Sequence, residues 1–405
     1  MPTSNPSPLP THVVCHVIET LEHGGAQAVL SRLVVGIHGS AYHPVVCCLR
    51  GGPVQEQIEA SGIPVHVLNL KRPSILAGRS FIAFVFQSLK GLNEVVRTER
   101  VTIIHAHMPD GIIWATCAGI LTRTPVIGTY HGLGILPAGR WRFDPRNVVR
   151  RALYRLVARL SDRSVAVSIP VKDLLCREIG FEENRTVVLI NGIDTELFGA
   201  TDDCCRVRAE LGLVGQHVIV CTGRLIAAKG HRFLVEAMAS VVREHPNAVL
   251  VLVGDGPERT VLEERAHALA LGDRVHFVGE RNDVSNILAM AEIFVLPSFS
   301  EGIPLALVEA MAAGKPVVAT AVPGNSDVIG DQRYGVLVPV RDARALADAL
   351  CGLLRDPARA RAIGARGRAR ARSHFDIKRS LAETTALYDE ILAERGVRQG
   401  QIVRQ

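Results

Sequence analysis

The stretch 293–320, IFVLPSFSEGIPLALVEAMAAGKPVVAT, contains the pattern that decides the fold. It begins with a short apolar run at 293–296, passes through a polar loop into a helical pattern, and ends with a second apolar run at 316–319. A strand, a helix and a strand in this order predict two neighbouring parallel strands joined by a crossover helix. The unit places Glu301 in the loop after a strand and Glu309 inside the helix.

The same alternation continues on both sides of this stretch. Helical patterns, for example at 26–37, 80–97 and 231–245, separate short apolar runs. Such alternation predicts an α/β protein built from doubly wound parallel sheets. The other strands are expected at 12–17, 44–49, 65–68, 103–105, 126–129 and 164–167 in the first half, and at 187–190, 218–222, 248–253, 275–278 and 335–338 in the second.

The length of the chain indicates two domains. A chain of 405 residues exceeds what one ordinary hydrophobic core holds. The turn-rich Asn191-Gly-Ile-Asp194 marks the break, so we expect domains at 1–187 and 188–375 and a helical segment at 376–405 that packs back toward the first domain. Without a low-complexity linker, the two domains are expected to face each other across a cleft, where the carboxyl ends of their strands would bind ligands.

Composition excludes several classes of protein. Hydrophobic residues make up 48% and charged residues 21%, which indicates a globular rather than a disordered chain. The net charge of +6 is modest, and we expect no nucleic-acid partner. Nine cysteines without a CxxC motif predict reduced thiols and a cytoplasmic location. The first residues lack the regions of a signal peptide, and no apolar run is long enough to span a bilayer.

Two common phosphate-binding motifs are absent. Ala313-Gly-Lys315 is followed by proline and lacks the upstream glycine of a P-loop, which argues against ATP hydrolysis of that type. Gly132-Leu-Gly134 follows a strand, but Pro137 occupies the third position of the dinucleotide fingerprint. A nicotinamide cofactor is therefore not expected.

Other motifs at strand ends are candidates for anion binding. Gly24 and Gly25 follow the first strand, where paired glycines let backbone amides approach a phosphate, although a plain tight turn has the same pattern. Arg224 and Lys229 follow the strand at 218–222. They could clamp a diphosphate, the arginine by its planar fork and the lysine as a point charge, or they could be ordinary surface charges.

Glu301 and Glu309 form the strongest motif. A carboxylate within Leu-Ala-Leu-Val-Glu-Ala-Met is costly to bury unless something donates hydrogen bonds to it. Sugar and ribose hydroxyls are suitable hydrogen-bond donors for this carboxylate. The alternative is a structural glutamate that pairs with a neighbouring helix. His105 and His107 alternate at another strand end, where they could ligate a metal or form a buried hydrogen-bonded pair.

Taken in order, these motifs resemble the retaining glycosyltransferases of the GT4 family, which have the GT-B fold of two facing Rossmann-like domains. The resemblance covers residues from about 12 to 320. The matching motifs are Gly24-Gly-Ala-Gln27, His105-Ala-His107, Tyr130-His-Gly132, Asn191-Gly-Ile-Asp194, Gly223-Arg-Leu with Lys229-Gly230, Val253-Gly-Asp-Gly-Pro257, and Glu301 with Glu309 and its Gly-Lys-Pro tail.

The resemblance implies a role for each matching residue. Arg224 and Lys229 would bind the donor diphosphate and stabilise the departing charge. His131 would lie near the anomeric centre and the acceptor, across the cleft from Glu301, which would hold hydroxyls of the donor sugar. The remaining donor-binding residues are Gly25 near the phosphates or the acceptor, Gly302, Ile303, Pro304 and Leu305 with Glu301, Glu309 on the ribose, and Gly254, Gly256 and Arg281 around the base.

The resemblance also implies the reaction. Such enzymes retain the anomeric configuration and need neither metal nor cofactor. A UDP-sugar is the favoured hexose donor, a GDP-sugar comes next, and a saccharide or lipid-linked acceptor of bacterial surface polysaccharide or glycolipid synthesis is expected. Ile-Ala-Ala follows Gly223-Arg-Leu, where many relatives carry Pro-Glu, so the local turn differs. A sugar-nucleotide epimerase and a non-catalytic nucleotide-sugar-binding subunit are the alternatives.

The segment from Arg140 to Arg163 carries eight arginines against two aspartates. Within it, Val149, Leu153, Leu156 and Leu160 fall on one helical face. This pattern fits a peripheral helix on an anionic membrane surface, or a domain helix that packs on its sheet with a solvated outer face.

Overall fold

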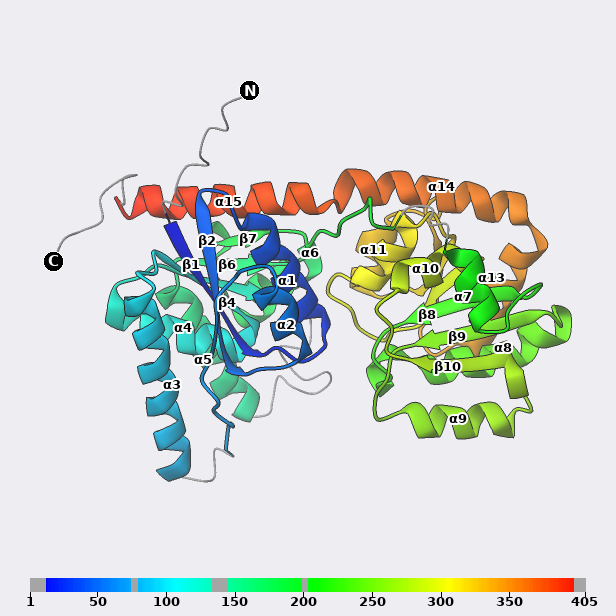
Figure 1. The fold of residues 1–405 in the computed structure, drawn as a ribbon, viewed down its shortest axis with the longest axis horizontal. Helices are drawn as coiled ribbons and strands as arrows, with labels where there is room; N and C mark the ends of the chain where they lie inside the picture. The colour runs from blue at the N-terminus through cyan, green and yellow to red at the C-terminus, as the bar shows by residue number, and fades with distance from the viewer. Residues whose placement is uncertain (1–11, 74–78, 133–144, 199–202, 397–405) are drawn as a thin grey trace. The chain divides into compact units, whose positions relative to one another are not determined.

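The computed structural model describes residues 12–73, 79–132, 145–198 and 203–396. These residues fold into two compact units (Figure 1). The first unit contains the chain up to Ile190 together with the segment from Ser380 onward, and the second contains residues 191–379. Each unit is a parallel sheet with helices on its faces, which confirms the predicted α/β class.

The first sheet has seven parallel strands in the order β3-β2-β1-β4-β5-β6-β7. The order reverses at β1, which is the signature of a doubly wound sheet. Its strands are β1 (His12–Thr20), β2 (Tyr42–Arg50), β3 (Val65–Val67), β4 (Ile103–His107), β5 (Val126–Tyr130), β6 (Arg163–Ala166) and β7 (Thr186–Val188). Its helices are α1 (Gly25–Ile37), α2 (Pro53–Glu59), α3 (Arg79–Thr98), α4 (Met108–Thr122), α5 (Pro145–Leu160), α6 (Ile169–Asp173) and most of α15 (Ile377–Glu394).

The two faces of this sheet pack against different helices. Val14 and Ile103 point to the face where α1 and α15 contribute Ile37 and Tyr388 to one buried cluster. Because side chains alternate along a strand, Val17 points to the opposite face, where α3 and α4 pack.

The short strand β7 corrects the division expected from sequence. An apolar run at 187–190 was assigned to the second sheet, with the domain boundary after residue 187. In the structure, Thr186–Val188 pairs with β6 and forms an edge of the first sheet. A three-residue strand has no periodicity of its own, and only its pairing partner decides the sheet to which it belongs.

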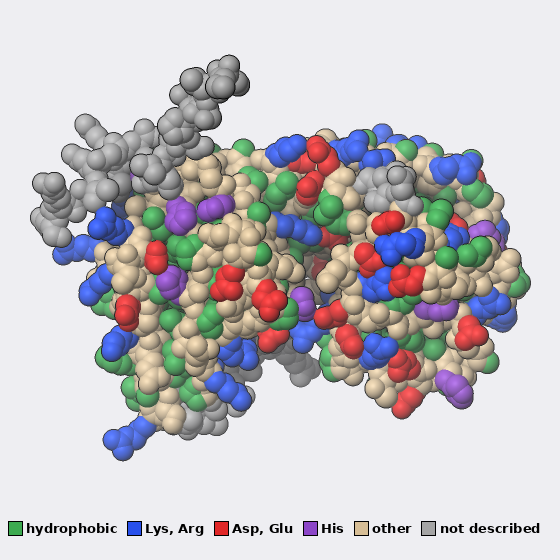
Figure 2. Space-filling model, in the orientation of Figure 1, with side chains coloured by type: hydrophobic (Ala, Val, Ile, Leu, Met, Phe, Trp, Pro, Cys, Tyr) green, Lys and Arg blue, Asp and Glu red, His purple; other side chains and the backbone are tan. Residues whose placement is uncertain are grey.

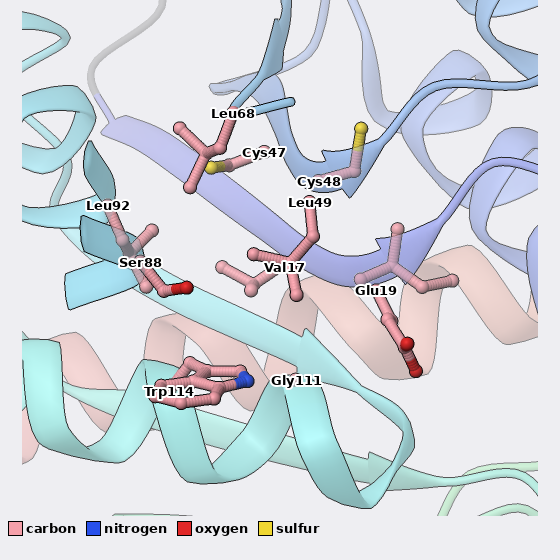
Figure 3. Close-up of a pocket in the computed structure, with 11 residues that line it drawn as sticks. Val17, Glu19, Cys47, Cys48, Leu49, Leu68, Ser88, Leu92, Gly111 and Trp114 are labelled. Atoms are coloured by element: carbon pink, nitrogen blue, oxygen red, sulfur yellow. The ribbon is translucent and has the colours of Figure 1, made fainter. Parts of the chain in front are cut away.

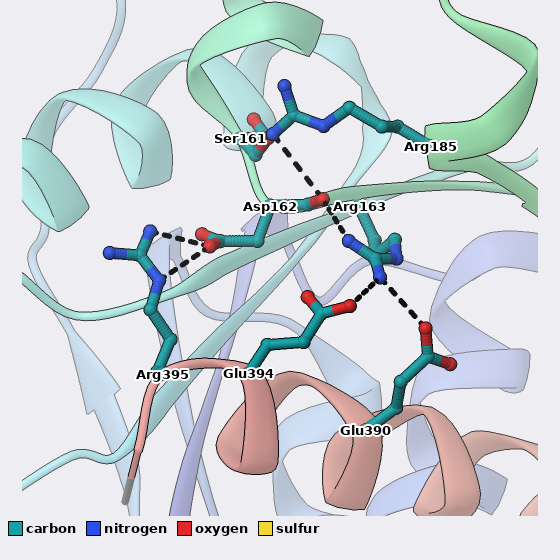
Figure 4. A network of polar contacts seen from close by, with 7 residues as sticks. All are labelled: Ser161, Asp162, Arg163, Arg185, Glu390, Glu394 and Arg395. Carbon is teal, nitrogen blue, oxygen red and sulfur yellow. Dashed lines mark hydrogen bonds and ion pairs between the residues drawn. The ribbon is translucent and has the colours of Figure 1, made fainter.

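Helix α15 is fastened to the first unit by a polar network (Figure 4). Arg163 at the start of β6 donates hydrogen bonds to Glu390 at 2.8 Å and to Glu394 at 2.5 Å. Arg395 donates to Asp162. These ion pairs lie at the rim of a core that contains buried Tyr388, so apolar burial rather than the exposed charges holds most of the helix in place.

The second sheet has six parallel strands in the order β10-β9-β8-β11-β12-β13. The βαβ unit read from 293–320 is present as β11, α11 and β12. The strands are β8 (His217–Thr222), β9 (Ala248–Val253), β10 (Val275–Gly279), β11 (Ile293–Leu296), β12 (Val317–Thr320) and β13 (Val336–Val338). The α-helices that belong wholly to this unit are α7 (Cys204–Glu210), α8 (His231–Glu244), α9 (Arg259–Ala268), α10 (Val284–Met290), α11 (Leu305–Ala312), α12 (Pro323–Ile329), α13 (Ala343–Arg355) and α14 (Pro357–His374).

Acidic and basic side chains are interspersed on the face of the second unit that Figure 2 shows. Charged side chains of this unit pair along or between helices, as Arg259 does with Glu263 and Arg355 with Glu244. This mixture fits the modest net charge of the chain.

Helix α5 presents its apolar stripe to solvent. Val149 is 69% exposed, and Leu153 and Leu156 are also exposed, while Tyr154 and Val157 on another face are buried. The predicted stripe exists, but it is not the face that packs on the domain. Arg151 and Arg155 donate to the backbone carbonyls of Glu178 and Ile179, respectively. Across the described segments of the chain, none of the helices combines the length and apolar character that crossing a bilayer requires.

Candidate active site

Two loops at the carboxyl ends of β8 and β9 are joined backbone to backbone. The Leu225 amide donates to the Asp255 carbonyl at 2.9 Å, and the Glu258 amide donates back to the Leu225 carbonyl at 3.0 Å. A Cβ on Gly254 would lie 2.3 Å from the Gly223 carbonyl oxygen, and one on Gly256 would lie 2.4 Å from that of Leu225. Both glycines are therefore required for this close approach.

A third loop, after β11, packs on the same region. The Phe299 amide donates to the Ala228 carbonyl at 2.8 Å. Gly230 has φ +69°, and a Cβ there would lie 2.2 Å from the Pro297 carbonyl oxygen. The loops after β8 and β11 are therefore fixed to each other by the backbone, which holds the side chains between them in place.

Lys229 and Glu301 meet at this junction. Lys229 Nζ donates to Glu301 Oε1 at 2.7 Å, and the two side chains are 27% and 10% exposed, respectively. The sequence predicted both residues for one site, although they lie on different crossover units. The arrangement pairs a carboxylate that can accept from hydroxyls with a cation that can attract an anion.

Other predicted donor-site residues of the second unit lie on the same loops or on the helix that follows them. Arg224 is exposed at the end of β8. Gly302, Ile303 and Pro304 lead into α11, which begins at Leu305 and has no side-chain cap at Pro304. Glu309 lies on α11 and is partly exposed, between buried Val308 and Ala310. The side chain is therefore less buried than the apolar sequence around it suggested.

Arg281 is placed differently from the expectation for a base pocket. It follows β10, and its guanidinium donates to both carboxylate oxygens of Asp283 at 2.8 Å and to Glu210 at 2.8 Å. These hydrogen bonds raise the pKa of Arg281 above its ordinary value. The side chain holds the turn to α7, so its contribution to a nucleotide site would come from the backbone or the aliphatic stem.

In the first unit, Gly25 begins α1 directly after the loop that follows β1. A Cβ built on Gly25 would have no atom within 4 Å, so internal packing does not require glycine there. A close approach by a ligand would require it. The Gln27 side chain donates to the Thr20 carbonyl at 3.2 Å and fixes the loop to β1.

His131 is one end of a row of three histidines. The Nε2 atom of His131 lies 3.1 Å from His107 Nδ1, and His107 Nε2 lies 3.2 Å from His16 Nδ1. His16 lies in the middle of β1, His107 is the last residue of the neighbouring strand β4, and His131 follows β5. Sequence analysis missed His16, because its position opposite His105 depends on the pairing of two strands far apart in the chain.

His105 belongs to a second, adjacent row. Its Nδ1 atom is hydrogen-bonded to the Tyr388 hydroxyl at 2.6 Å, and its Nε2 atom to the Thr129 hydroxyl at 2.7 Å. Ring nitrogens of His16, His105 and His107 lie within 4.8 Å of one another, a grouping that could hold a metal. A metal ligated by His105 would displace one of its two hydrogen bonds, so the network favours the hydrogen-bonded alternative.

Burial keeps these imidazoles neutral. Desolvation lowers the pKa of His131 to about 4. It also lowers the pKa values of His16, His105 and His107 well below their ordinary range, and each of these three is further lowered by neighbouring imidazoles. None of the four can serve as a cation near neutral pH.

A small apolar hollow lies elsewhere in the first unit (Figure 3). Val17, Leu49, Leu92 and Trp114 line it, with the Ser88 hydroxyl pointing inward. The hollow lies between the sheet and helices α3 and α4, and it contains none of the residues predicted to bind the donor.

Two models of known protein families match this chain, one in its first half and one in its second half. The model of Glycosyltransferase Family 4 matches residues 23–197, and that of Glycosyl transferases group 1 matches residues 206–370. The D-inositol 3-phosphate glycosyltransferase of Corynebacterium kroppenstedtii is 30% identical over 334 residues, which cover 78% of this chain and 72% of that protein. The chain belongs to glycosyltransferase family 4. The glycosyltransferase is also 27% identical, over 309 residues, to the UDP-Gal:alpha-D-GlcNAc-diphosphoundecaprenol alpha-1,3-galactosyltransferase of Escherichia coli, covering 75% of this chain and 78% of that one.

Solved structures show the same fold. Anabaena HepE, solved in complex with UDP-glucose, superposes on the glycosyltransferase with a TM-score of 0.80 at 22% identity, covering 93% of this chain and 99% of HepE. WaaG, a glycosyltransferase involved in lipopolysaccharide biosynthesis, gives a TM-score of 0.70 at 19% identity, covering 92% and 98%. These neighbours confirm the GT-B class.

Proposed function

We propose that the glycosyltransferase transfers a hexose from a nucleotide diphosphate donor, with UDP-sugars favoured over GDP-sugars, to a saccharide or lipid-linked acceptor, with retention of anomeric configuration. The observation that carries this proposal is the contact between Lys229 and Glu301 at the junction of two strand-end loops. Family membership fixes the reaction class, and relatives whose names specify a UDP donor or a diphosphoundecaprenol acceptor support the finer assignment.

The donor-side chemistry follows from the charges at this junction. Lys229 and exposed Arg224 would bind the diphosphate and stabilise the negative charge that develops on it as the sugar leaves. When the diphosphate attracts Lys229, Glu301 is freed to accept hydrogen bonds from sugar hydroxyls. Glu309, with the segment of Gly302 to Leu305 before it, would hold the ribose and the sugar.

We assign this charge stabilisation to Arg224, Lys229 and helix amides and propose that no metal ion is required. His131 of the first unit is the proposed contact for the reacting sugar or the acceptor. Retention would follow from attack on the face that the diphosphate leaves, with the diphosphate itself taking the acceptor proton. This route needs no enzymic nucleophile, and Glu301 is assigned to binding.

A thermal-shift panel of UDP, GDP, ADP and their common sugar conjugates tests the donor assignment. A ligand at about 100 times its Kd adds roughly 2.7 kcal/mol of apparent stability. We expect a shift with the UDP series, a reduced shift in Glu309→Ala, and an unchanged shift in Glu264→Ala, an exposed glutamate on α9. A shift with the GDP series alone would replace UDP, and a full UDP shift in Glu309→Ala would remove Glu309 from the site.

Product analysis tests the reaction itself. Incubation with UDP-glucose and a panel of saccharide and polyprenyl-linked acceptors should give a glycoside whose anomeric configuration matches the donor. Conversion of the donor into an epimer without a glycoside would support the epimerase alternative. Donor binding without turnover of any acceptor would support a non-catalytic subunit.

We also propose that helix α5 rests on an anionic membrane surface, as a peripheral cytoplasmic protein would. The supporting observation is that Val149, Leu153 and Leu156 are exposed on a helix whose sequence is rich in arginine. Co-sedimentation with vesicles of phosphatidylglycerol and phosphatidylcholine should be lost in Leu153→Ser/Leu156→Ser. It should be retained in Val261→Ser, an exposed apolar residue on helix α9. Equal binding by both variants would exclude α5 as the docking face.

A further inference from the structure

The hydrogen bonds of the histidine row do not by themselves decide which end of the row carries the remaining N–H proton. The row has two hydrogen bonds, between His16 and His107 and between His107 and His131. Three neutral imidazoles carry three N–H protons, and each hydrogen bond uses one of them. One proton therefore remains for an end of the row, either on His16 Nε2 or on His131 Nδ1. Both atoms are buried, and neither has a hydrogen-bond partner among the described residues.

The two ends differ in their surroundings. His16 is 0% exposed, and it lies on β1 opposite His105 of β4. His131 follows β5 and is partly exposed as a residue, although Nδ1 itself is shielded. A buried N–H without a partner is rarer in proteins than an acceptor left under-satisfied. Only the His131 end of the row borders solvent, where a bound substrate can supply the acceptor that this N–H needs, so the lone pair belongs on His16 and the free proton on His131.

The position of the proton on His16 determines the tautomers of His107 and His131. If His16 has its proton on Nδ1, it donates to His107 Nε2. His107 must then have its own proton on Nδ1, and it donates to His131 Nε2. With Nε2 accepting, the only position left for the proton of His131 is Nδ1.

We propose that His16 and His107 are positioning residues that hold neutral His131 with its proton on Nδ1, so that His131 offers an N–H donor to an oxygen of the bound substrates. No proton is transferred in this role, because the row orients a hydrogen bond. The inference deepens the proposed function and rests on it only for the identity of the substrate, since the tautomer is a property of the protein alone.

The neighbouring row provides the internal control. His105 is equally enclosed, but its partners are Tyr388 and Thr129, and no hydrogen bond of the described structure links it to His131. Tyr388→Phe should therefore disturb His105 while leaving the tautomer of His131 unchanged.

The first test is spectroscopic and uses the full wild-type chain. Long-range proton–nitrogen NMR spectra of ¹⁵N-histidine-labelled protein at pH 7 distinguish the two neutral tautomers, and His131→Gln assigns the signals. We expect His131 to be neutral with its proton on Nδ1. A proton on Nε2, or on both nitrogens, would overturn the proposal.

The second test uses two nearly isosteric replacements of His107, one that can donate a hydrogen bond to His131 and one that can only accept it. His107→Asn keeps an amide N–H that can donate to His131 Nε2, whereas His107→Asp offers only acceptor oxygens when ionised. We expect His107→Asn to retain the Nδ1 proton and a kcat within about 10-fold of wild type. His107→Asp should move the proton to Nε2 and lower kcat by about 100-fold or more, with a smaller change in KM.

Equal kcat values and an unchanged tautomer in the two variants would remove His107 from the positioning role. If wild-type protein transfers no sugar from any nucleotide donor, the proposed function fails. The NMR result for wild type still decides the tautomer in that case, so the two failures are distinguishable.

Discussion

The two units place different chemistry at the same topological position. At the carboxyl edge of the second sheet, Lys229 and Glu301 form a partly exposed ion pair held by backbone contacts between loops. At the carboxyl edge of the first sheet, His107 and His131 form part of a buried, neutral row held by side-chain hydrogen bonds. The charged edge can attract an anionic ligand from solvent, whereas the neutral edge can only orient groups that reach it. A doubly wound sheet therefore fixes where a ligand binds, and the loop residues decide how.

Removal of Arg224 or Lys229 should lower kcat more than any other change, if these two cations stabilise the charge that develops during catalysis. We expect Arg224→Ala and Lys229→Ala each to lower kcat by about 10²–10³-fold. Arg224→Ala should change the free energy of unfolding by less than about 0.5 kcal/mol, because its side chain is exposed. Steady-state transfer assays make the measurement.

Arg232→Ala is the matched control, since Arg232 is an exposed arginine on α8 that pairs with Glu236. Its kcat should stay at the wild-type value. A similar loss of activity in this control, or near-normal turnover in either site variant, would contradict the diphosphate clamp.

A glycine pair tests the backbone contacts that hold the charged edge. Gly230 and Gly212 share φ +69°, but only at Gly230 would a Cβ meet another backbone, at 2.2 Å from the Pro297 oxygen. Gly212→Ala should destabilise the second unit by about 1–2 kcal/mol through φ strain alone. Gly230→Ala should cost more and should also lower donor affinity.

Hydrogen exchange of the β8 and β11 amides measures both stabilities, and UDP titration measures the affinity. If the two variants behave alike, the contact between the loops does not matter for the site.

The buried neutral histidines of the first unit should make the free energy of unfolding depend on pH. The pKa of His131 is lowered to about 4 from an ordinary value of 6.5, and those of His16, His105 and His107 are lowered as well. The unfolded chain binds protons below pH 6.5 that the folded chain does not bind. The free energy of unfolding is therefore highest above that pH and falls as the pH drops from about 6.5 toward 4, by about 1.4 kcal/mol per pH unit for His131; the lowered pKa values of the other three histidines act in the same direction.

Tryptophan fluorescence reports on the first unit, because Trp114 lies on helix α4 and the sequence 191–379 of the second unit contains no tryptophan. Urea midpoints should fall between pH 6.5 and 5, and His16→Phe should remove about one proton from the linkage. A flat profile over this interval would show that the row is protonated in the folded protein.

The smallest effect is expected at the rim of the first unit. Arg395 is 52% exposed and pairs with Asp162 at 2.5 Å. Because solvent screens exposed pairs, Arg395→Ala should lower the free energy of unfolding by no more than about 1 kcal/mol. The difference should shrink in 1 M salt, where the Debye length is about 3 Å. A larger loss that persists in salt would mean that Arg395 acts through packing.

Sequence reasoning predicted most of the charged edge and little of the neutral one. Lys229 and Glu301 could be assigned to one site because each follows a strand, and strand order is readable from alternating patterns. Their contact could not be read, since it depends on the backbone packing of Gly230 on the next loop. The row of His16 and His107 depends on the register between strands far apart in the chain, which no local pattern contains.

Two further differences have the same origin. The sequence places an apolar run at 187–190 in the second sheet, but Thr186–Val188 pairs with β6 of the first sheet, because so short a strand carries no information about its pairing partner. The apolar stripe of α5 is predictable from sequence, but the choice between an exposed stripe and one packed on the sheet is not, because periodicity identifies a face without saying what covers it.

The placement of α15 has a consequence for biosynthesis. The second unit is one continuous segment, whereas the first takes Leu387, Tyr388 and Ile391 from the far end of the chain into its core. Domains usually fold from the amino terminus onward as the ribosome releases them. Here the first unit to be translated is the last to be completed, since its core stays open until the final helix leaves the exit tunnel. A chain truncated after residue 379 would contain all of the second unit, together with a first unit whose His105 lacks its Tyr388 partner.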